Sequence, residues 1–321
     1  MTKYRPIIIV PGEPNSVFFE IFFKSLKNKI HSPIILVGSY KLLKLQMKSL
    51  KYKIKVNLLN HDELLNYKLR NNSINIIDVE YNFTKSFQKK SKRYNQYIEK
   101  TFQIAFKIIK NNISNKFING PISKKTFLKN KYLGVTEYIS DKFNIKKNAM
   151  LIYNKELSVC PVTTHLPIKL VAKKISKKKI IEKVELINKF YKYYLNKKPK
   201  IAVLGLNPHC ESVHLYNEDE KIIKPTVNFL KKKNYSISGP HSADTMFLKQ
   251  NRKKFDVILG MYHDQVLIPI KSLFEYDAIN ITLGLPFIRI SPDHGPNEKM
   301  LGKNISNPLS LIRAISFLDK K

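Results

Sequence analysis

The sequence has few cysteines and no long apolar run, and each shortage excludes a class of protein. Cys160 and Cys210 are too few for a disulfide framework, and a chain of 321 residues can bury enough core to fold without disulfides or a structural metal. No apolar run approaches the ~18 residues of a membrane-spanning helix. The apolar run at residues 7–10 is too short for a signal peptide, so a reducing cytoplasm is the expected compartment.

Acidic residues and arginine are also scarce. The chain has 58 Lys+Arg against 24 Asp+Glu, a formal net charge of +34, a balance that nucleic-acid-binding proteins share. However, 52 of the basic residues are lysine and only 6 are arginine, whereas recognition of phosphates and base edges favours arginine. We therefore expect non-specific attraction to polyanions, with neither a specific nucleic-acid partner nor a membrane partner.

Short apolar runs alternate with longer helical stretches along the chain, which predicts an α/β fold with a mostly parallel sheet. The predicted strands are residues 7–10, 34–37, 74–79, 117–118, 149–153, 157–162, 201–206, 257–261 and 278–283. The predicted helices are residues 17–29, 93–110, 177–195, 218–232 and 308–318. The length predicts about two domains. Because no clean linker separates them, we expect residues 1–321 to form one catalytic unit of two interleaved α/β subdomains.

Three of the eight histidines follow directly after predicted strands, namely His165, His209 and His263. Ligands bind beyond the carboxyl ends of strands in open α/β sheets, and three imidazoles with an open fourth position form a catalytic metal site. Such long spacing carries no motif information, so three unrelated polar loop residues are the alternative interpretation.

A second candidate feature is positive charge among apolar residues. Arg289 ends the segment 280–289, and Lys271 follows the apolar residues 266–270. An arginine in such surroundings needs an anionic partner, either a structural carboxylate or the carboxylate or phosphate of a substrate. The sequence contains no G-x-G-x-x-G, P-loop or G-x-S-x-G motif, so these three kinds of site are not indicated.

Four of these segments together carry a family resemblance. Residues 162–167 (VTTHLP), 205–209 (GLNPH), 261–265 (MYHDQ) and 280–289 (NITLGLPFIR) closely resemble motifs of the 4-hydroxythreonine-4-phosphate dehydrogenases, the PdxA family. Shorter matches at residues 119–122 (NGPI), 239–240 (GP) and 243–245 (ADT) follow in the same order. The resemblance covers most of the chain and is strongest from about residue 117 onward.

The resemblance implies a fold, an assembly and a reaction. The fold is like that of isocitrate and isopropylmalate dehydrogenases, with two domains around a cleft, and the assembly is a homodimer with the active site at its interface. In the implied reaction of pyridoxal phosphate biosynthesis, NAD (or NADP) oxidises the C3 hydroxyl of 4-phosphooxy-L-threonine. The resulting β-keto acid loses carbon dioxide and gives 3-amino-2-oxopropyl phosphate.

The resemblance also assigns a metal site. It makes His165, His209 and His263, contributed from both subunits, the ligands of a divalent metal, with zinc expected and magnesium or cobalt as alternatives. A bound metal lowers the pKa of a coordinated hydroxyl and stabilises an enolate. Asp264 is adjacent to a ligand and is a candidate to orient it or to accept a proton.

By the same resemblance, the substrate contacts are Thr136, Lys271, Asn280 and Arg289, and the positive charges of Lys271 and Arg289 offset the substrate phosphate and carboxylate. We name Lys271 and Asp264 as candidate catalytic residues. The segment from residue 291 to residue 303 is similar to the adenosine-binding loop of the wider fold, which makes His294 and Gly295 candidate cofactor contacts, with a structural turn as the alternative.

The sequence departs from the family pattern at Val135. The family has Gly-His-Thr-Glu where this chain has Gly134-Val135-Thr136-Glu137, and the family histidine contacts the substrate. The N-terminal and His209 segments are also poorer in glycine than in the family. Two alternatives therefore stay open, a related dehydrogenase of another phosphorylated hydroxy acid, such as a four-carbon sugar acid phosphate, and a non-catalytic homologue.

Overall fold

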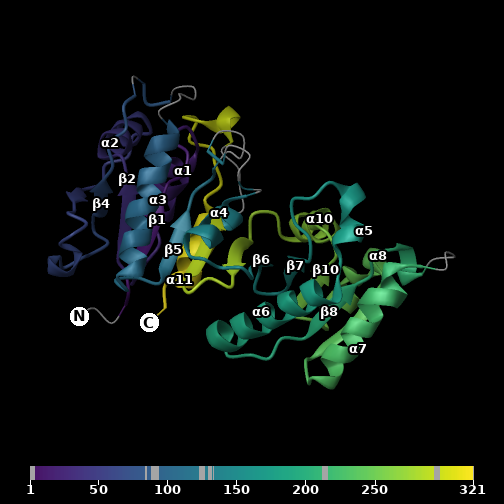
Figure 1. Cartoon of the computed structure of the whole chain (residues 1–321). Coiled ribbons are helices and arrows are strands. Elements are labelled where there is room, and N and C mark those ends of the chain that lie inside the picture. The colour runs from purple at the N-terminus through teal and green to yellow at the C-terminus, as the bar shows by residue number, and fades with distance from the viewer. Residues whose placement is uncertain are drawn as a thin grey trace. The chain divides into compact units, whose positions relative to one another are not determined.

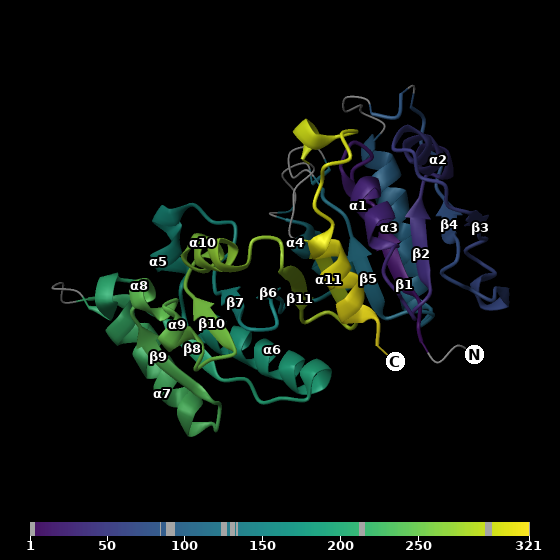
Figure 2. The same ribbon diagram turned by 180° about the vertical axis from the view of Figure 1, so that it is seen from behind.

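A computed structural model describes residues 4–83, 85–87, 94–122, 127–128, 132, 134–211, 216–292 and 297–320. The chain divides into two compact units (Figures 1 and 2). Unit 1 comprises Met1–Val135 and Pro286–Lys321, and unit 2 comprises Thr136–Leu285. In this described part of the chain, no helix is long and apolar enough to cross a membrane.

The strands of unit 1 form a fully parallel arrangement in the order β3-β4-β2-β1-β5-β12. They are β1 (Ile7–Val10), β2 (Ile34–Gly38), β3 (Val56–Leu58), β4 (Ile74–Asp78), β5 (Lys116–Asn119) and β12 (Ile288–Pro292). The central strands are apolar and buried along their whole length, as expected for parallel strands that helices cover on both faces. The last strand, β12, pairs with β5 although all of unit 2 separates them in the sequence.

Helices cover both faces of this sheet. They are α1 (Phe18–Ser25), α2 (Tyr40–Ser49), α3 (Tyr94–Lys110) and α11 (Leu309–Leu318). Figures 1 and 2 show α3 on one face and α1 with α11 on the other, and α2 packs beside α1. Aromatic residues fill the space between helix and sheet; for example, the rings of Phe102 in α3 and Phe117 in β5 meet edge to face at 5.8 Å.

The strands of unit 2 follow the order β11-β6-β7-β10-β8-β9. They are β6 (Ala149–Tyr153), β7 (Ser158–Pro161), β8 (Ile201–Leu204), β9 (Ile237–His241), β10 (Val257–Gly260) and β11 (Ile279–Leu283). Only β6 runs antiparallel to its neighbours, so β11 runs in the same direction as β7. The carboxyl ends of β7, β8, β10 and β11 therefore lie at one edge of the sheet.

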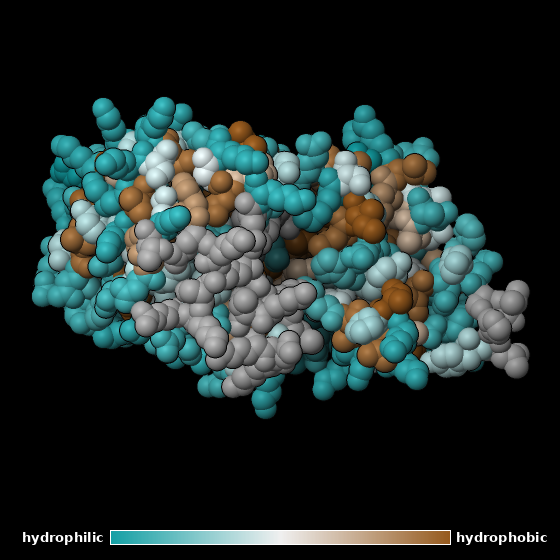
Figure 3. Space-filling view, turned by 90° about the horizontal axis from the view of Figure 1, so that it is seen from above, coloured by the Kyte–Doolittle hydropathy of each residue, from teal (hydrophilic) through white to brown (hydrophobic). Residues whose placement is uncertain are grey.

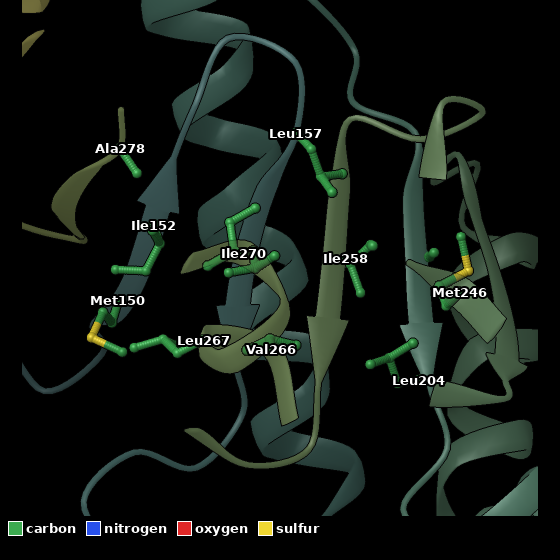
Figure 4. Packing of buried hydrophobic residues seen from close by; sticks show 12 residues of the cluster. Met150, Ile152, Leu157, Leu204, Met246, Ile258, Val266, Leu267, Ile270 and Ala278 are labelled. Atoms are coloured by element: carbon green, nitrogen blue, oxygen red, sulfur yellow. The ribbon is translucent and has the colours of Figure 1, made fainter. Parts of the chain in front are cut away.

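The helices of unit 2 are α4 (Val135–Lys142), α5 (Val171–Lys174), α6 (Lys177–Leu195), α7 (Lys224–Lys232), α8 (Ala243–Met246), α9 (Lys249–Arg252) and α10 (His263–Phe274). In Figure 4, Val266 and Ile270 of α10 lie over the sheet between Ile152 and Ile258. This packing fixes the start of α10 at the carboxyl edge of the sheet, directly after β10.

The α/β class with a mostly parallel sheet and flanking helices is confirmed. Residues 7–10, 149–153 and 177–195 form β1, β6 and α6 with the predicted bounds. Other bounds were wrong: β8 ends at Leu204, before the predicted residue 206, and α1 ends at Ser25. Residues 219–223 form a π-helical turn before α7, because the segment predicted as one helix changes its hydrogen-bond pattern there.

Polar residues dominate the face of the molecule in Figure 3, with smaller hydrophobic areas between them. Lysine clusters occur at residues 173–174, 177–179, 197–198 and 231–233, which lie in α5, α6 and α7 or within three residues of their ends. Their exposure is that of ordinary solvated helix faces.

Candidate active site

The three predicted metal-binding histidines belong to unit 2 and follow β7, β8 and β10, whose carboxyl ends lie together. The hydroxyl of Thr163 ties two of these strand exits together by donating a 2.7 Å hydrogen bond to the carbonyl of Met261. The side-chain amide of Gln265 links the exits of β10 and β8. Its Oε1 accepts a hydrogen bond from the Met261 N–H at 2.7 Å, and its Nε2 donates one to the Gly205 carbonyl at 2.8 Å. The edge of the sheet is thus held rigidly where the histidines begin.

The structure brings His165 and His263 together. Their ring centroids are 5.7 Å apart and their planes are inclined by 40°. Nδ1 of His263, the first residue of α10, lies 2.6 Å from Oδ1 of Asp264. A carboxylate at Nδ1 leaves Nε2 as the nitrogen for a further ligand. Two imidazoles that share a tetrahedral ion at bond lengths of about 2.1 Å have ring centres on the order of 5 Å apart, close to the spacing of this pair.

The third histidine, His209, stands on a strained turn. Its backbone has φ 55°, in the left-handed region, and its side chain is 74% exposed. The turn is held by the buried carboxylate of Asp219, which accepts hydrogen bonds from the N–H groups of Leu206 at 2.8 Å and Asn207 at 3.0 Å. Position 205, just before this turn, needs a glycine, because a Cβ on that residue would lie 2.7 Å from Oδ1 of Asp219.

Asp244 is the carboxylate near His209. Its Oδ2 lies 4.0 Å from Nδ1 of the histidine, longer than a hydrogen bond. The hydrogen bond from the Ser242 hydroxyl and the nearby His209 hold the pKa of Asp244 below its usual value. Asp244 is therefore a charged carboxylate at neutral pH that attracts a cation or a histidine N–H.

Within the ranges that the structure describes, no three side chains of His, Cys, Asp or Glu are close enough to hold a metal ion. The site was predicted to take its ligands from two subunits, so the three-histidine assignment stays a prediction. The donors suit the group: imidazole nitrogen is a ligand of zinc and cobalt, and a carboxylate lies beside Nδ1 of two of the three rings.

Thr136 and Thr282 meet near the same edge of unit 2. Their hydroxyl oxygens are 3.4 Å apart, with Thr136 in the first turn of α4 and Thr282 next to the last residue of β11. Glu137 follows Thr136, and its Oε2 is buried without a hydrogen-bond partner among the described residues. Val135, at the start of α4, presents a partly buried apolar side chain at the position of the family histidine.

Lys271 and Asn280 lie farther along the chain. Lys271 is exposed on α10, eight residues after His263, which corresponds to roughly 12 Å along the helix axis. The structure therefore does not bring Lys271 to the histidine pair of its own chain. Asn280, in β11, is partly buried, and its Oδ1 meets no hydrogen-bond partner in the described part of the chain.

Arg289 lies in unit 1, in the strand β12. Its side chain is only 2% exposed, and its Nε donates a 2.7 Å hydrogen bond to Oδ1 of Asn119 at the end of β5. One partner of Arg289 is therefore the neutral amide of Asn119. The guanidinium of an arginine stays cationic when buried, so Arg289 is suited to binding an anionic group.

Two loops of unit 1 meet beside Asn119. Gly12 has φ 77°, and a Cβ at Gly120 would lie 1.9 Å from the carbonyl oxygen of Pro11. The N–H of Glu13 donates to the Pro121 carbonyl at 2.9 Å, which joins the loops. Their buried polar side chains, which sequence reasoning did not assign, are Glu13, Asn15 and Ser16.

The candidate cofactor contacts His294 and Gly295 lie outside the described residues. Cys160 is buried within β7 as core, as its strand position predicts, and burial raises the pKa of its thiol to about 12. Cys160 is therefore excluded as a nucleophile at neutral pH.

Comparison with known proteins gives one family. The profile of the family described as pyridoxal phosphate biosynthetic protein PdxA matches residues 29–318. The 4-hydroxythreonine-4-phosphate dehydrogenase of Sulfurihydrogenibium sp. (strain YO3AOP1) is 37% identical over 317 residues, which cover 96% of this chain and 96% of that protein. The protein of the same name from Colwellia psychrerythraea is 31% identical over 318 residues, with 97% and 96% covered.

A solved structure is similar throughout. The 4-hydroxythreonine-4-phosphate dehydrogenase of Klebsiella pneumoniae superposes with a TM-score of 0.84 at 25% sequence identity, covering 99% of this chain and 98% of that one. The similarity therefore includes both units and is not confined to the histidine motifs.

Proposed function

This chain belongs to the PdxA family of pyridoxal phosphate biosynthetic proteins, and from that membership we propose that it is a 4-hydroxythreonine-4-phosphate dehydrogenase. The substrate, 4-phosphooxy-L-threonine, loses a hydride from C3 to NAD and then carbon dioxide, which yields 3-amino-2-oxopropyl phosphate. The observation that carries the proposal is the relationship to the Sulfurihydrogenibium enzyme over 96% of both chains.

We propose that the substrate is held by Thr136, Lys271, Asn280 and Arg289. The substrate carries a phosphate and a carboxylate, and the two cationic side chains neutralise charges of this kind. Arg289 is suited to the role because burial and the Asn119 hydrogen bond fix its guanidinium before an anion arrives. The partly buried Asn280 carries an amide oxygen that suits a ligand hydroxyl or ammonium group.

A divalent metal fits the histidines. His165, His209 and His263 are proposed as the ligands of zinc, with magnesium or cobalt as alternatives. When bound, such an ion supplies Lewis acidity that favours an alkoxide at C3 and an enolate after decarboxylation. Asp264 orients His263 by holding its Nδ1, which leaves Nε2 for the ion.

The proton of the C3 hydroxyl needs an acceptor, for which Asp264 is the proposed candidate, and Lys271 is proposed as a catalytic cation that stabilises developing negative charge. Both lie on α10, Asp264 at its first turn beside His263 and Lys271 at its last turn. Because Lys271 is about 12 Å from His263 along the helix axis of one chain, we propose that the Lys271 and His263 of one site come from different subunits, with the metal ligands also drawn from both subunits. This arrangement requires a homodimer with the active site at its interface.

Cofactor and compartment complete the proposal. NAD (or NADP) is proposed to contact His294 and Gly295, and the enzyme is expected in the cytoplasm. One observation favours a second candidate function: Val135 stands where the family contacts the substrate with histidine. A related dehydrogenase that oxidises another phosphorylated hydroxy acid, such as a four-carbon sugar acid phosphate, is therefore the alternative.

The test is NADH formation at 340 nm from NAD and 4-phosphooxy-L-threonine, with zinc or magnesium added and then removed by a chelator. Metal-dependent turnover supports the proposal. Turnover only with a four-carbon sugar acid phosphate supports the alternative. A folded, metal-loaded dimer that oxidises neither substrate and does not bind NAD is instead a non-catalytic homologue.

A further inference from the structure

Unit 1 carries a large groove whose lining includes none of the residues proposed to bind substrate, metal or cofactor. It lies between α2 and residues 51–56, which lead into the edge strand β3, and its volume is about 1210 Å³. We call it the lysine groove, because six of its thirteen lining residues are lysines, against 52 lysines among 321 residues in the whole chain. The composition of the chain alone therefore does not account for it.

The lysines form two rows. Lys41, Lys44 and Lys48 are spaced three and four residues apart on α2, so they share one face of the helix. In residues 51–56, lysines alternate with Tyr52, Ile54 and Val56, and the lysines are exposed whereas the other three residues are half-buried. The groove thus has a cationic rim along both sides and an apolar floor.

Among the described residues, no acidic group forms an ion pair with this rim. The sequence contains no Asp or Glu between Glu20 and Asp62, and the lysines of the groove form no ion pair with any residue that the structure describes. The carboxylate of Asp78 lies at the start of α2, where it accepts a 2.8 Å hydrogen bond from the N–H of Tyr40. The positive charge of the rim is therefore available to a ligand.

The shape and chemistry of the groove distinguish between ligand classes. Its volume exceeds the roughly 300–1,000 Å³ of small-molecule sites. Single-stranded nucleic acid needs free aromatic faces and favours arginine. Here Lys41 lies 5.7 Å from the ring centre of Phe83, Tyr52 packs against Phe23, and the groove contains no arginine.

We propose that the lysine groove binds an acidic amphipathic helix of a protein partner. Such a helix places its apolar face on the floor, and its carboxylates meet the two lysine rows. Lysine suits this role because its flexible ammonium group adapts to carboxylates at different positions. The proposal is independent of the dehydrogenase activity.

The probe is a fluorescein-labelled synthetic helix of about 15 residues, with leucines on one face and glutamates on both borders. Its binding to the full-length protein is measured by fluorescence anisotropy at two salt concentrations. We expect binding that weakens with salt and falls at least about tenfold in the double variant Lys44→Glu, Lys48→Glu. The variant Ile54→Ser is expected to weaken binding without reducing its salt dependence.

The matched control is Lys231→Glu, Lys232→Glu on α7, which changes the net charge equally in unit 2. It is expected to bind the peptide like the parent protein, and circular dichroism verifies the fold of each variant. Equal loss in both double variants would show non-specific attraction and overturn the proposal, as would no binding. Tighter binding of a poly(dT) strand or of anionic phosphatidylserine vesicles, sensitive to the α2 variant, would replace the peptide by that ligand.

Discussion

Asn119 Oδ1 accepts a 2.7 Å hydrogen bond from Arg289 Nε, and neither side chain is more than 2% exposed. Asn119 is the last residue of β5, and Arg289 lies in β12, the strand that pairs with β5. The Asn119 amide therefore helps to orient the buried guanidinium of Arg289. In the proposed enzyme that guanidinium binds an anionic group of the substrate.

Replacing Asn119 by alanine should reduce both stability and substrate affinity. Loss of a hydrogen bond to a charged group lowers the free energy of unfolding by about 1.5–3 kcal/mol, measured by urea denaturation. The KM for 4-phosphooxy-L-threonine should rise about tenfold, because Arg289 loses its fixed orientation.

The control for this change is Asn75→Ala. Asn75 is also a buried amide with hydrogen bonds to two backbone carbonyls, at 3.1 and 3.0 Å, but it lies in β4. The Asn75→Ala substitution should lower the free energy of unfolding by a similar amount and leave KM unchanged. An Asn119→Ala enzyme with the parent KM would show that Asn119 has only a structural role.

The carboxylates beside the histidines should differ in their effect on metal affinity. Asp264 lies 2.6 Å from His263, whereas Asp244 lies 4.0 Å from His209. Asp264→Ala should weaken zinc binding about 10–100-fold, measured by competition with a chromophoric chelator, and Asp244→Ala should weaken it less. Equal effects of the two substitutions would contradict a specific role for the short contact.

Asp319 should make stability depend on pH. Burial raises its pKa, but hydrogen bonds from the backbone N–H groups of His31 and Ser32 outweigh that effect and leave the pKa lowered. A lowered folded-state pKa stabilises the fold above the unfolded pKa of about 3.9. At pH 7, Asp319→Asn should therefore be less stable by about 1–3 kcal/mol.

The difference between parent and Asp319→Asn should shrink as the pH falls below about 4, because the unfolded chain then takes up the proton first, and it should vanish once the pH is below the lowered folded-state pKa. Urea denaturation at pH 7, 5 and 3 measures it. The control is Asp62→Asn, which removes an exposed partner of Lys107 and should change unfolding little. A deficit that persists undiminished at pH 3 argues against the charge of Asp319 as the cause.

Val135→His should restore the family contact. If the substrate is 4-phosphooxy-L-threonine, the added charge-assisted contact should lower KM or raise kcat by about ten- to hundredfold. Val135→Leu keeps an apolar side chain at the start of α4 and should leave both constants near those of the parent. A histidine variant without gain on this substrate directs attention to other phosphorylated hydroxy acids.

Local signals explain which elements the sequence predicts. Helix α6 was predicted with its observed bounds because its apolar spacing is regular, and the structure adds a cap at each end: the Ser176 hydroxyl accepts from the N–H of Lys179, and Asn196 adopts the left-handed conformation. Strand β9 was missed because Gly239 and Pro240 interrupt it. Proline is tolerated there because β9 is an edge strand. Helix α10 was missed because it contains Pro269.

The strand-exit pattern located the histidines but not what supports them. The amide of Gln265 bonds to the Gly205 carbonyl, 60 residues earlier in the sequence. The carboxylate of Asp219 accepts hydrogen bonds from the N–H groups of Leu206 and Asn207, 13 and 12 residues earlier. Such contacts depend on how strands are ordered in the sheet, which short-range periodicity does not encode. The contact between Arg289 and Asn119 could not be predicted for the same reason, because the two residues are 170 positions apart in the sequence.

The pairing of β5 with β12 has a consequence for synthesis on the ribosome. β5 is synthesised before unit 2, and its partner strand β12 is synthesised after it. One edge of β5 therefore stays unpaired while the whole of unit 2 is translated. Unit 2 is contiguous and can fold as soon as residue 285 has left the exit tunnel, whereas unit 1 also needs residues 286–321, which are made after unit 2. The half of the protein that is started first is therefore finished last, and premature termination spares unit 2 at the expense of unit 1.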